Sequence, residues 1–181
     1  MTHANKDIHT RLRDARIGAA LAVLTILFGF GLGGAFGAFE DALKADLTAR
    51  GQAVVATVYG GDEAKAKSVA DRSFNYYKRA HLHGGGIGGA ALGLIVLLAL
   101  LRRPTAMVRR VIAGALGVGA FGYSLFWLLA ARAAPTLGGT DAAKESLEWL
   151  AVPAAGLLLL GLVAVLVLTL VDLFGRPPAE A

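Results

Sequence analysis

Two ionisable side chains, Asp41 and His81, have the types and the placement to act together chemically. Each lies four residues beyond a ladder of glycines, and the two ladders are mirror images about Gly61: Gly29, Gly33 and Gly37 in one apolar run, Gly85, Gly89 and Gly93 in the other. In an antiparallel hairpin that turns at Gly61, mirror-image residues lie at the same height. The pattern therefore predicts a carboxylate facing an imidazole, which would fix the ring tautomer and raise its basicity.

The Asp41–His81 pair has two interpretations. In the first it is a binding site, because glycines one turn deeper would leave room for a flat cofactor against His81. In the second it is a structural hydrogen bond that closes the hairpin where the two helices leave the lipid.

A second histidine, His83, lies two residues further along the same predicted helix. Residues two apart on a helix point about 200° apart, so one unbroken helix does not turn both imidazoles onto one metal ion. We expect His83 to face the third and fourth membrane helices. If the glycines at 84–86 unwind, a site for Zn, Cu or Fe would use His81, His83, Asp41, Glu145 and Glu148.

The segment Ala80-His81-Leu82-His83, followed by the glycine-rich stretch 84–89, resembles the start of the haem-carrying helix in relatives of haem–copper oxidase subunit I. The resemblance implies haem b as a cofactor, with His81 as a ligand and His83 beside it. Such relatives supply further ligands from histidines on other membrane helices, and the other apolar runs of this chain contain none. This departure leaves five-coordinate haem, or a ligand from a partner protein.

Four apolar runs must position these residues: 16–39, 84–101, 111–131 and 150–174. Each is close to the roughly 20 residues that a membrane helix needs, and ionisable side chains are rare within them. The chain is 56% apolar and has a mean hydropathy of +0.60, high for a soluble protein. The predicted fold class is an all-α integral membrane protein in which four transmembrane helices form a four-helix bundle.

The first two helices are expected to continue outside the membrane as a long antiparallel hairpin over residues 40–83, with its turn at Gly60-Gly61 and Asp62 as an N-cap. Within the membrane the two ladders would form a glycine zipper, because small residues at every fourth position let helix backbones approach closely. The remaining predicted segments are a tail over 1–15, a loop over 102–110, a loop with a short helix over 132–149, and a tail over 175–181.

Positive charges near the ends of the spans predict the orientation. They are Lys6, Arg11, Arg13 and Arg16 before the first span, and Arg102, Arg103, Arg109 and Arg110 in the second connection. By the positive-inside rule, both tails and the 102–110 loop are cytoplasmic and residues 40–83 are periplasmic. The sequence thus predicts a multi-pass protein of the bacterial inner membrane. The segment 144–153 also resembles segments of small bacterial four-helix inner-membrane proteins of unknown role.

Composition excludes several function classes. The chain has no cysteine, which rules out disulfides, thiolate metal sites and cysteine nucleophiles. A self-contained transporter is not expected, because transport needs ionisable residues at membrane depth. The pI of about 9.8 follows from topology, so no nucleic-acid partner is expected.

The leading interpretation is a non-enzymatic structural or accessory subunit, which lies in the lipid bilayer and binds a membrane or periplasmic protein through its hairpin. One alternative is a redox subunit that binds haem b or a metal through His81, with His83 beside it. Another is an enzyme that acts on a lipid or a periplasmic substrate through His81 and Asp41.

Overall fold

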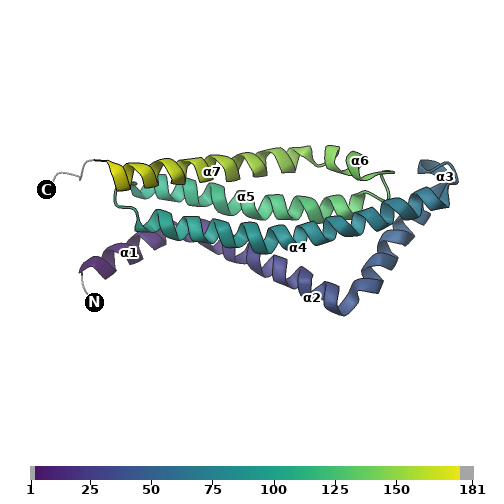
Figure 1. The fold of residues 1–181 in the computed structure, drawn as a ribbon, viewed down its shortest axis with the longest axis horizontal. Helices are drawn as coiled ribbons and strands as arrows, with labels where there is room; N and C mark the ends of the chain where they lie inside the picture. Colours follow the sequence, from purple (N-terminus) through teal and green to yellow (C-terminus); the bar gives the residue numbers. More distant parts are fainter. Residues whose placement is uncertain (1–2, 176–181) are drawn as a thin grey trace.

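The computed structural model describes residues 3–175, with side chains from residue 7 onward, and every element in this part of the chain is a helix (Figure 1). The order along the chain is α1 (His3–Asp14), α2 (Arg16–Gln52), α3 (Val55–Val58), α4 (Glu63–Leu100), α5 (Ala106–Ala133), α6 (Thr140–Glu145) and α7 (Glu148–Phe174). The predicted all-helical fold class is confirmed for these residues.

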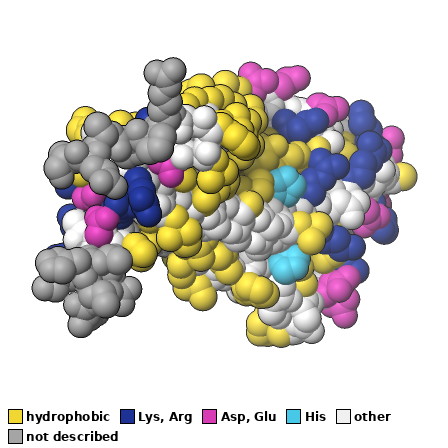
Figure 2. Space-filling model, turned by 60° about the vertical axis from the view of Figure 1, so that its left-hand side comes forward, with side chains coloured by type: hydrophobic (Ala, Val, Ile, Leu, Met, Phe, Trp, Pro, Cys, Tyr) yellow, Lys and Arg dark blue, Asp and Glu magenta, His cyan; other side chains and the backbone are white. Residues whose placement is uncertain are grey.

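Four of these helices, α2, α4, α5 and α7, are long and apolar enough to cross a membrane. Charged side chains gather towards the two ends of the molecule, while apolar side chains dominate the surface between them (Figure 2). This distribution fits a multi-pass membrane protein, because the lipid-facing surface of a helix bundle is apolar.

Helix α5 is the central one of these four helices. In the most apolar 18-residue stretch of α5, 56% of the residues are buried, against 17% in the corresponding stretches of α2 and α7. Helix α5 contacts α2, α4 and α7, whereas α7 packs on α5 and only slightly on α4. The four helices are therefore layered, with α7 covering one side of α5 and α2 lying on the other side of the molecule (Figure 1).

The chain reverses between α3 and α4 at Gly60 and Gly61, as the sequence predicts. Their φ angles are 62° and 89°, in the left-handed region that glycine adopts without steric cost. Asp62 is the N-cap of α4, and its side chain accepts a hydrogen bond of 2.8 Å from the backbone N–H of Lys65. The predicted turn and cap are confirmed.

The arm that leads to this turn is bent. Helix α2 has a non-helical residue at Phe39 (φ −139°, ψ 26°), the last residue of the predicted first span. Figure 1 shows α2 diverging from α4 before this bend and returning towards it near α3. Aromatic rings fill the space at this level, since Phe36 lies edge-on to both Phe74 and His81 at centroid distances of 5.8 Å.

The bend changes which residues of α2 and α4 face each other. A Cβ on Gly29 would clash with the backbone of Gly84 and Gly85, and the position opposite Gly33 is filled by His81. The mirror pairs 29/93, 33/89 and 37/85 are therefore wrong. Mirror symmetry about Gly61 requires two unbroken helices of equal length. The α2 arm instead takes more residues than α4 to cover the same distance, because it bends and then breaks at 53–54 before α3.

The predicted glycine zipper is consequently used only in part. Gly29 and Gly33 pack against α4, where the close contacts come from Gly84, the backbone nitrogen of Gly85, and His81. Added Cβ atoms on the other four members of the ladders would meet no described atom within 4 Å; these are Gly37, Gly85, Gly89 and Gly93.

Disulfide cross-linking tests this register, because the chain has no native cysteine. A Cβ on Gly88 would lie 3.1 Å from the Thr25 Cβ, a few tenths of an ångström below the usual range of about 3.5–4.5 Å for a disulfide. Thr25→Cys with Gly88→Cys is expected to cross-link on mild oxidation, seen as a mobility shift that reductant reverses. Gly37→Cys with Gly85→Cys, the pair expected from mirror symmetry, is the control and should stay reduced.

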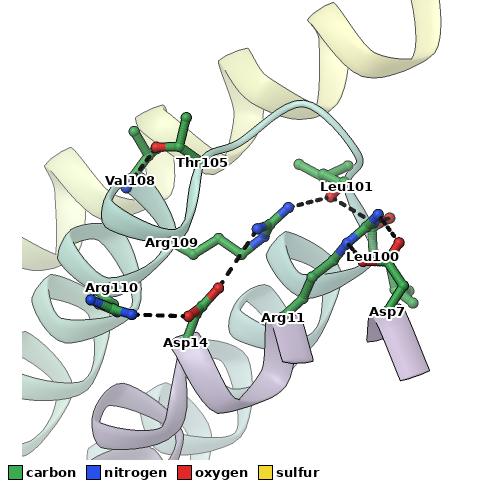
Figure 3. A network of polar contacts seen from close by, with 9 residues as sticks. All are labelled: Asp7, Arg11, Asp14, Leu100, Leu101, Thr105, Val108, Arg109 and Arg110. Atoms are coloured by element: carbon green, nitrogen blue, oxygen red, sulfur yellow. Dashed lines mark hydrogen bonds and ion pairs between the residues drawn. The ribbon is translucent and has the colours of Figure 1, made fainter. Parts of the chain in front are cut away.

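Residues predicted as a tail, 1–15, contain helix α1, which packs on α4 and α5. Arg11 of α1 donates to the Leu101 carbonyl at 3.2 Å and pairs with Asp7. Arg109 of α5 donates to the same carbonyl at 3.1 Å, and Asp14 lies between Arg109 and Arg110 (Figure 3). Polar side chains thus anchor α1 to the end of α4, so this part of the predicted tail is helical and packed against the bundle.

Other predicted boundaries move by a few residues. Helix α5 begins at Ala106, inside the predicted loop 102–110, because the Thr105 side chain caps it. Helix α7 begins at Glu148, within the predicted segment 132–149, and α6 is the short helix expected there. Of the tail predicted over 175–181, the part from position 176 onward lies outside the described residues.

Beyond the bend, the ends of α2 and α4 share one core with α5 and the 134–143 segment. Leu47, Val69, Tyr76 and Trp127 are all buried in this core. At the tip, the buried hydroxyl of Tyr59 donates a hydrogen bond of 2.7 Å to the carbonyl of Pro135. The segment 40–83 is therefore attached to the rest of the protein along its length.

Tyr59→Phe is expected to lower the free energy of unfolding by about 1–3 kcal/mol, because the buried Pro135 carbonyl loses its donor. Burial also raises the pKa of Tyr59 and of Tyr77. A tyrosine whose pKa is raised in the folded state stabilises the fold while it is neutral. For both residues this contribution is complete below the unfolded tyrosine pKa of about 10 and is lost as the pH rises above it. Unfolding in detergent from pH 8 to 11 checks both effects, and Tyr59→Phe should flatten the decline.

The control for this measurement is Thr57→Val. Its hydroxyl lies at the same tip, is exposed, and bonds locally to the Val54 carbonyl. A change of less than about 0.5 kcal/mol is expected for such a surface substitution. Equal losses in the two variants would contradict a specific role for the Tyr59–Pro135 bond.

Candidate functional site

His81 points from α4 towards α2. Its Nδ1 lies 2.7 Å from the carbonyl oxygen of Gly29, and because a carbonyl only accepts, Nδ1 must carry the hydrogen. In the neutral ring the lone pair is then on Nε2. The ring occupies the space that the missing side chain of Gly33 leaves, since a Cβ there would be 2.6 Å from the His81 Cε1.

The structure does not bring Asp41 to His81. Asp41 follows the bend at Phe39 and lies on an exposed part of α2, where its charge is one of the causes that raise the pKa of Lys44. The bend turns this part of α2 away from the position that a straight helix would give it. The flat space predicted beside His81 is also taken, because the imidazole itself covers Gly33.

His83 points towards α5, as its position two residues after His81 predicts. Its Nδ1 donates to the Arg79 carbonyl at 2.8 Å, one turn earlier in α4, so its lone pair is also on Nε2 when the ring is neutral. The imidazole lies 5.5 Å from the ring of Tyr123 and 5.8 Å from that of Trp127, measured between centroids.

Around His83 the side chains of α4 and α5 form an aromatic cluster, which we define as Tyr76, Arg79, His83, Tyr123, Phe126 and Trp127. The guanidinium of Arg79 lies over the rings of Trp127 and Tyr76, at 4.9 and 5.1 Å from their centroids. Within the described residues Arg79 makes no ion pair. The Trp127 Nε1 is buried and has no hydrogen-bond partner there.

The predicted metal set is not assembled. Among the described residues, no three His, Asp or Glu side chains lie close enough together to hold one metal ion. His81 and His83 face different helices, because α4 continues as a helix through the glycines at 84–86. Glu145 and Glu148 lie exposed at the ends of α6 and α7.

Sequence reasoning missed Arg79 and the aromatic cluster as a unit. A signal was present, because Tyr76, Arg79 and His83 follow each other at helical spacings of three and four. The interpretation of Arg109 as a topology signal also missed its burial, at 5% exposed. In both cases the partner is on another helix, which spacing along one helix does not identify.

Comparison with known proteins gives no assignment for this arrangement: no protein-family model, no curated protein and no solved structure matches the chain.

Proposed function

We propose that this chain is a non-enzymatic structural or accessory protein of the bacterial inner membrane, which binds a partner protein through residues 40–83. The observation that carries the proposal is the anchoring of this segment. Its tip is joined to the 134–139 region by the Tyr59–Pro135 hydrogen bond, and Leu47 is fully buried beneath it. A surface held in one shape loses little conformational entropy on binding.

The charges of this segment support a protein-binding surface. Lys67 and Asp71 form an exposed ion pair of 2.8 Å on α4, and Arg50 and Asp46 form another of 2.8 Å on α2. The hydrogen bond from Arg50 lowers the pKa of Asp46 and so favours its charged form. Fixed charges of both signs select a partner by complementarity.

The proposed orientation has cytoplasmic termini and a periplasmic α3 end. It is supported by the position of the basic residues around the start of α2 and the α4–α5 connection, since Arg11, Arg109 and Arg110 lie together at one end of the molecule (Figure 3). That end would face the cytoplasm under the positive-inside rule.

Site-specific photo-cross-linking in intact cells tests partner binding. A photoreactive residue at Gln52 or Ala64, both exposed on the segment, is expected to give discrete cross-linked products, and one at the lipid-facing Leu160 is not. The double variant Lys67→Asp with Asp71→Lys keeps an ion pair but reverses its direction. It should reduce the yield at least several-fold while insertion is unchanged; equal yields would contradict the proposal.

Point variants are preferable to removal of residues 45–75, because that removal would take Leu47, Tyr59 and Val69 out of the core that also contains Trp127. Loss of binding in a deletion would then report a damaged fold as readily as a lost surface.

One observation favours a second function, a haem- or metal-binding redox subunit. His81 donates from Nδ1 to a backbone carbonyl and keeps Nε2 as an acceptor, which is the arrangement found in metal-ligating histidines. Protein purified in detergent should then show a Soret band or bound metal that disappears in His81→Ala and persists in His83→Ala. A colourless, metal-free preparation would retire this alternative.

A further inference from the structure

A narrow apolar groove lies between α4 and α7, with α5 as its floor. Its volume is about 280 Å³, and its walls include Gly86, Ala90 and Leu94 of α4, Leu116 of α5, and Leu158 and Leu162 of α7. The groove exists because α7 packs on α5 and barely touches α4. Both walls belong to helices that are apolar enough to cross a membrane.

Arg79 and His83 lie on the same face of α4 as this groove. Arg79, His83, Gly86, Ala90 and Leu94 follow one another at spacings of three and four, which places them in one column along the helix. At 1.5 Å per residue, Arg79 lies about 10 Å beyond Gly86, and the groove continues for about 12 Å from Gly86 to Leu94. One leaflet of hydrocarbon is about 15 Å thick.

Two hydrogen-bond donors lie at the open end of this column, the guanidinium of Arg79 and the indole N–H of Trp127 on α5, and neither has an acidic partner in the described residues. Arg79 rests on the faces of Tyr76 and Trp127 and makes no ion pair there. The indole Nε1–H of Trp127, a residue that is 8% exposed, has no acceptor in the same part of the chain. Charge complementarity therefore favours an anion at Arg79.

We propose that this column binds one anionic phospholipid, with its phosphate at Arg79 and one acyl chain in the groove. The lipid belongs to the leaflet on the α3 side of the membrane. The inference rests on the membrane insertion that the proposed function assumes, and it is independent of the partner protein.

Lining and charge favour an acyl chain over a helix from another protein. The groove walls are apolar, which suits a hydrocarbon chain. A helix lying in the groove would leave Arg79, about 10 Å beyond Gly86, without a counter-charge, whereas a phospholipid brings a phosphate to that height.

The test uses the full chain in vesicles, with Trp149→Phe so that Trp127 is the single tryptophan of the two in the sequence. Phosphatidylglycerol or phosphatidylcholine with brominated acyl chains is added in increasing amounts, and quenching of Trp127 fluorescence is measured. We expect phosphatidylglycerol to quench at about a fivefold lower mole fraction, since one Arg near the surface contributes about that factor.

Arg79→Ala should abolish this preference, and Arg79→Lys should keep most of it. Lys78→Ala is the matched control, because Lys78 is the adjacent cation but lies over Phe74 on the α2 side. Gly86→Leu should weaken quenching by both lipids, because its side chain enters the groove from a position where an added Cβ meets no atom within 4 Å.

Equal quenching by the two lipids, or equal effects of Arg79→Ala and Lys78→Ala, would overturn the proposal. Absence of quenching together with a dimer in light scattering would assign the groove to a second copy of the chain, and would also overturn it. Flotation of the same vesicles measures insertion separately. Failure to float would contradict the membrane function, whereas flotation without a lipid preference would contradict this inference alone.

Discussion

Gly29→Leu is expected to lower the free energy of unfolding by roughly 3 kcal/mol or more, the upper range for overpacking a close contact. A Cβ at this position would meet the backbone nitrogen of Gly85 and the backbone carbons of Gly84. Backbone atoms cannot rotate aside as a side chain can, so α2 and α4 must separate. Denaturation in mixed detergent, followed by circular dichroism, measures the loss.

Separation of the helices would also move the carbonyl of Gly29 away from the His81 Nδ1 that donates to it. The imidazole would then lose its fixed orientation. We therefore expect the NMR signals of a ¹⁵N-labelled His81 ring to shift or broaden in Gly29→Leu, while those of His83 stay in place because its bond is to Arg79 in its own helix.

Gly31→Leu is the matched control. It lies two residues away in the same helix, and an added Cβ would meet no atom within 4 Å. Leucine at an exposed position of a helix has a better helix propensity than glycine by up to about 1 kcal/mol, so this variant should be neutral or slightly more stable. A loss in Gly93→Leu as large as in Gly29→Leu would contradict the register described above.

The sequence allowed the helices and the turn to be predicted because their causes are local. Apolar runs of the length of a bilayer predict α2, α4, α5 and α7, and Gly60-Gly61-Asp62 predicts a turn followed by an N-cap. The direction of His83 was also predictable, since it depends on the helical angle from His81 alone. These features need no knowledge of any other helix.

The pairing of α2 with α4 was not predictable from mirror-image glycines, because it depends on the shape of the whole arm. The bend at Phe39 has no proline at its site, and the aromatic rings of Phe36 and Phe74 that accompany it come from two helices. The bend removes Asp41 from His81 and thus removes the predicted site. The arrangement of α4 side chains that face α5 and α7 depends on contacts between helices, and the residue pattern of a single helix does not contain them.

Asp14→Ala is expected to cost roughly 3 kcal/mol, the lower end of the range for breaking a buried ion pair. The Asp14 carboxylate lies 3.9 Å from Arg109, and the two side chains are 14% and 7% exposed. Without Asp14, the guanidinium of Arg109 keeps the Leu101 carbonyl as an acceptor, and its Nε already has no partner in the described residues. Thermal unfolding in detergent measures the loss, together with protease cleavage within α1.

The controls separate the buried charge from charge in general. Arg110 binds the same carboxylate at 3.3 Å but is 65% exposed, so Arg110→Ala should change stability by less than about 1 kcal/mol. The double variant Asp14→Ala with Arg109→Met removes both charges and should recover part of the loss, because no unpaired charge then remains inside. Equal losses for Arg110→Ala and Asp14→Ala would show that α1 is held by surface attraction alone. In that case Arg109 would be buried for packing, and Arg109→Met alone should leave α1 attached to α4.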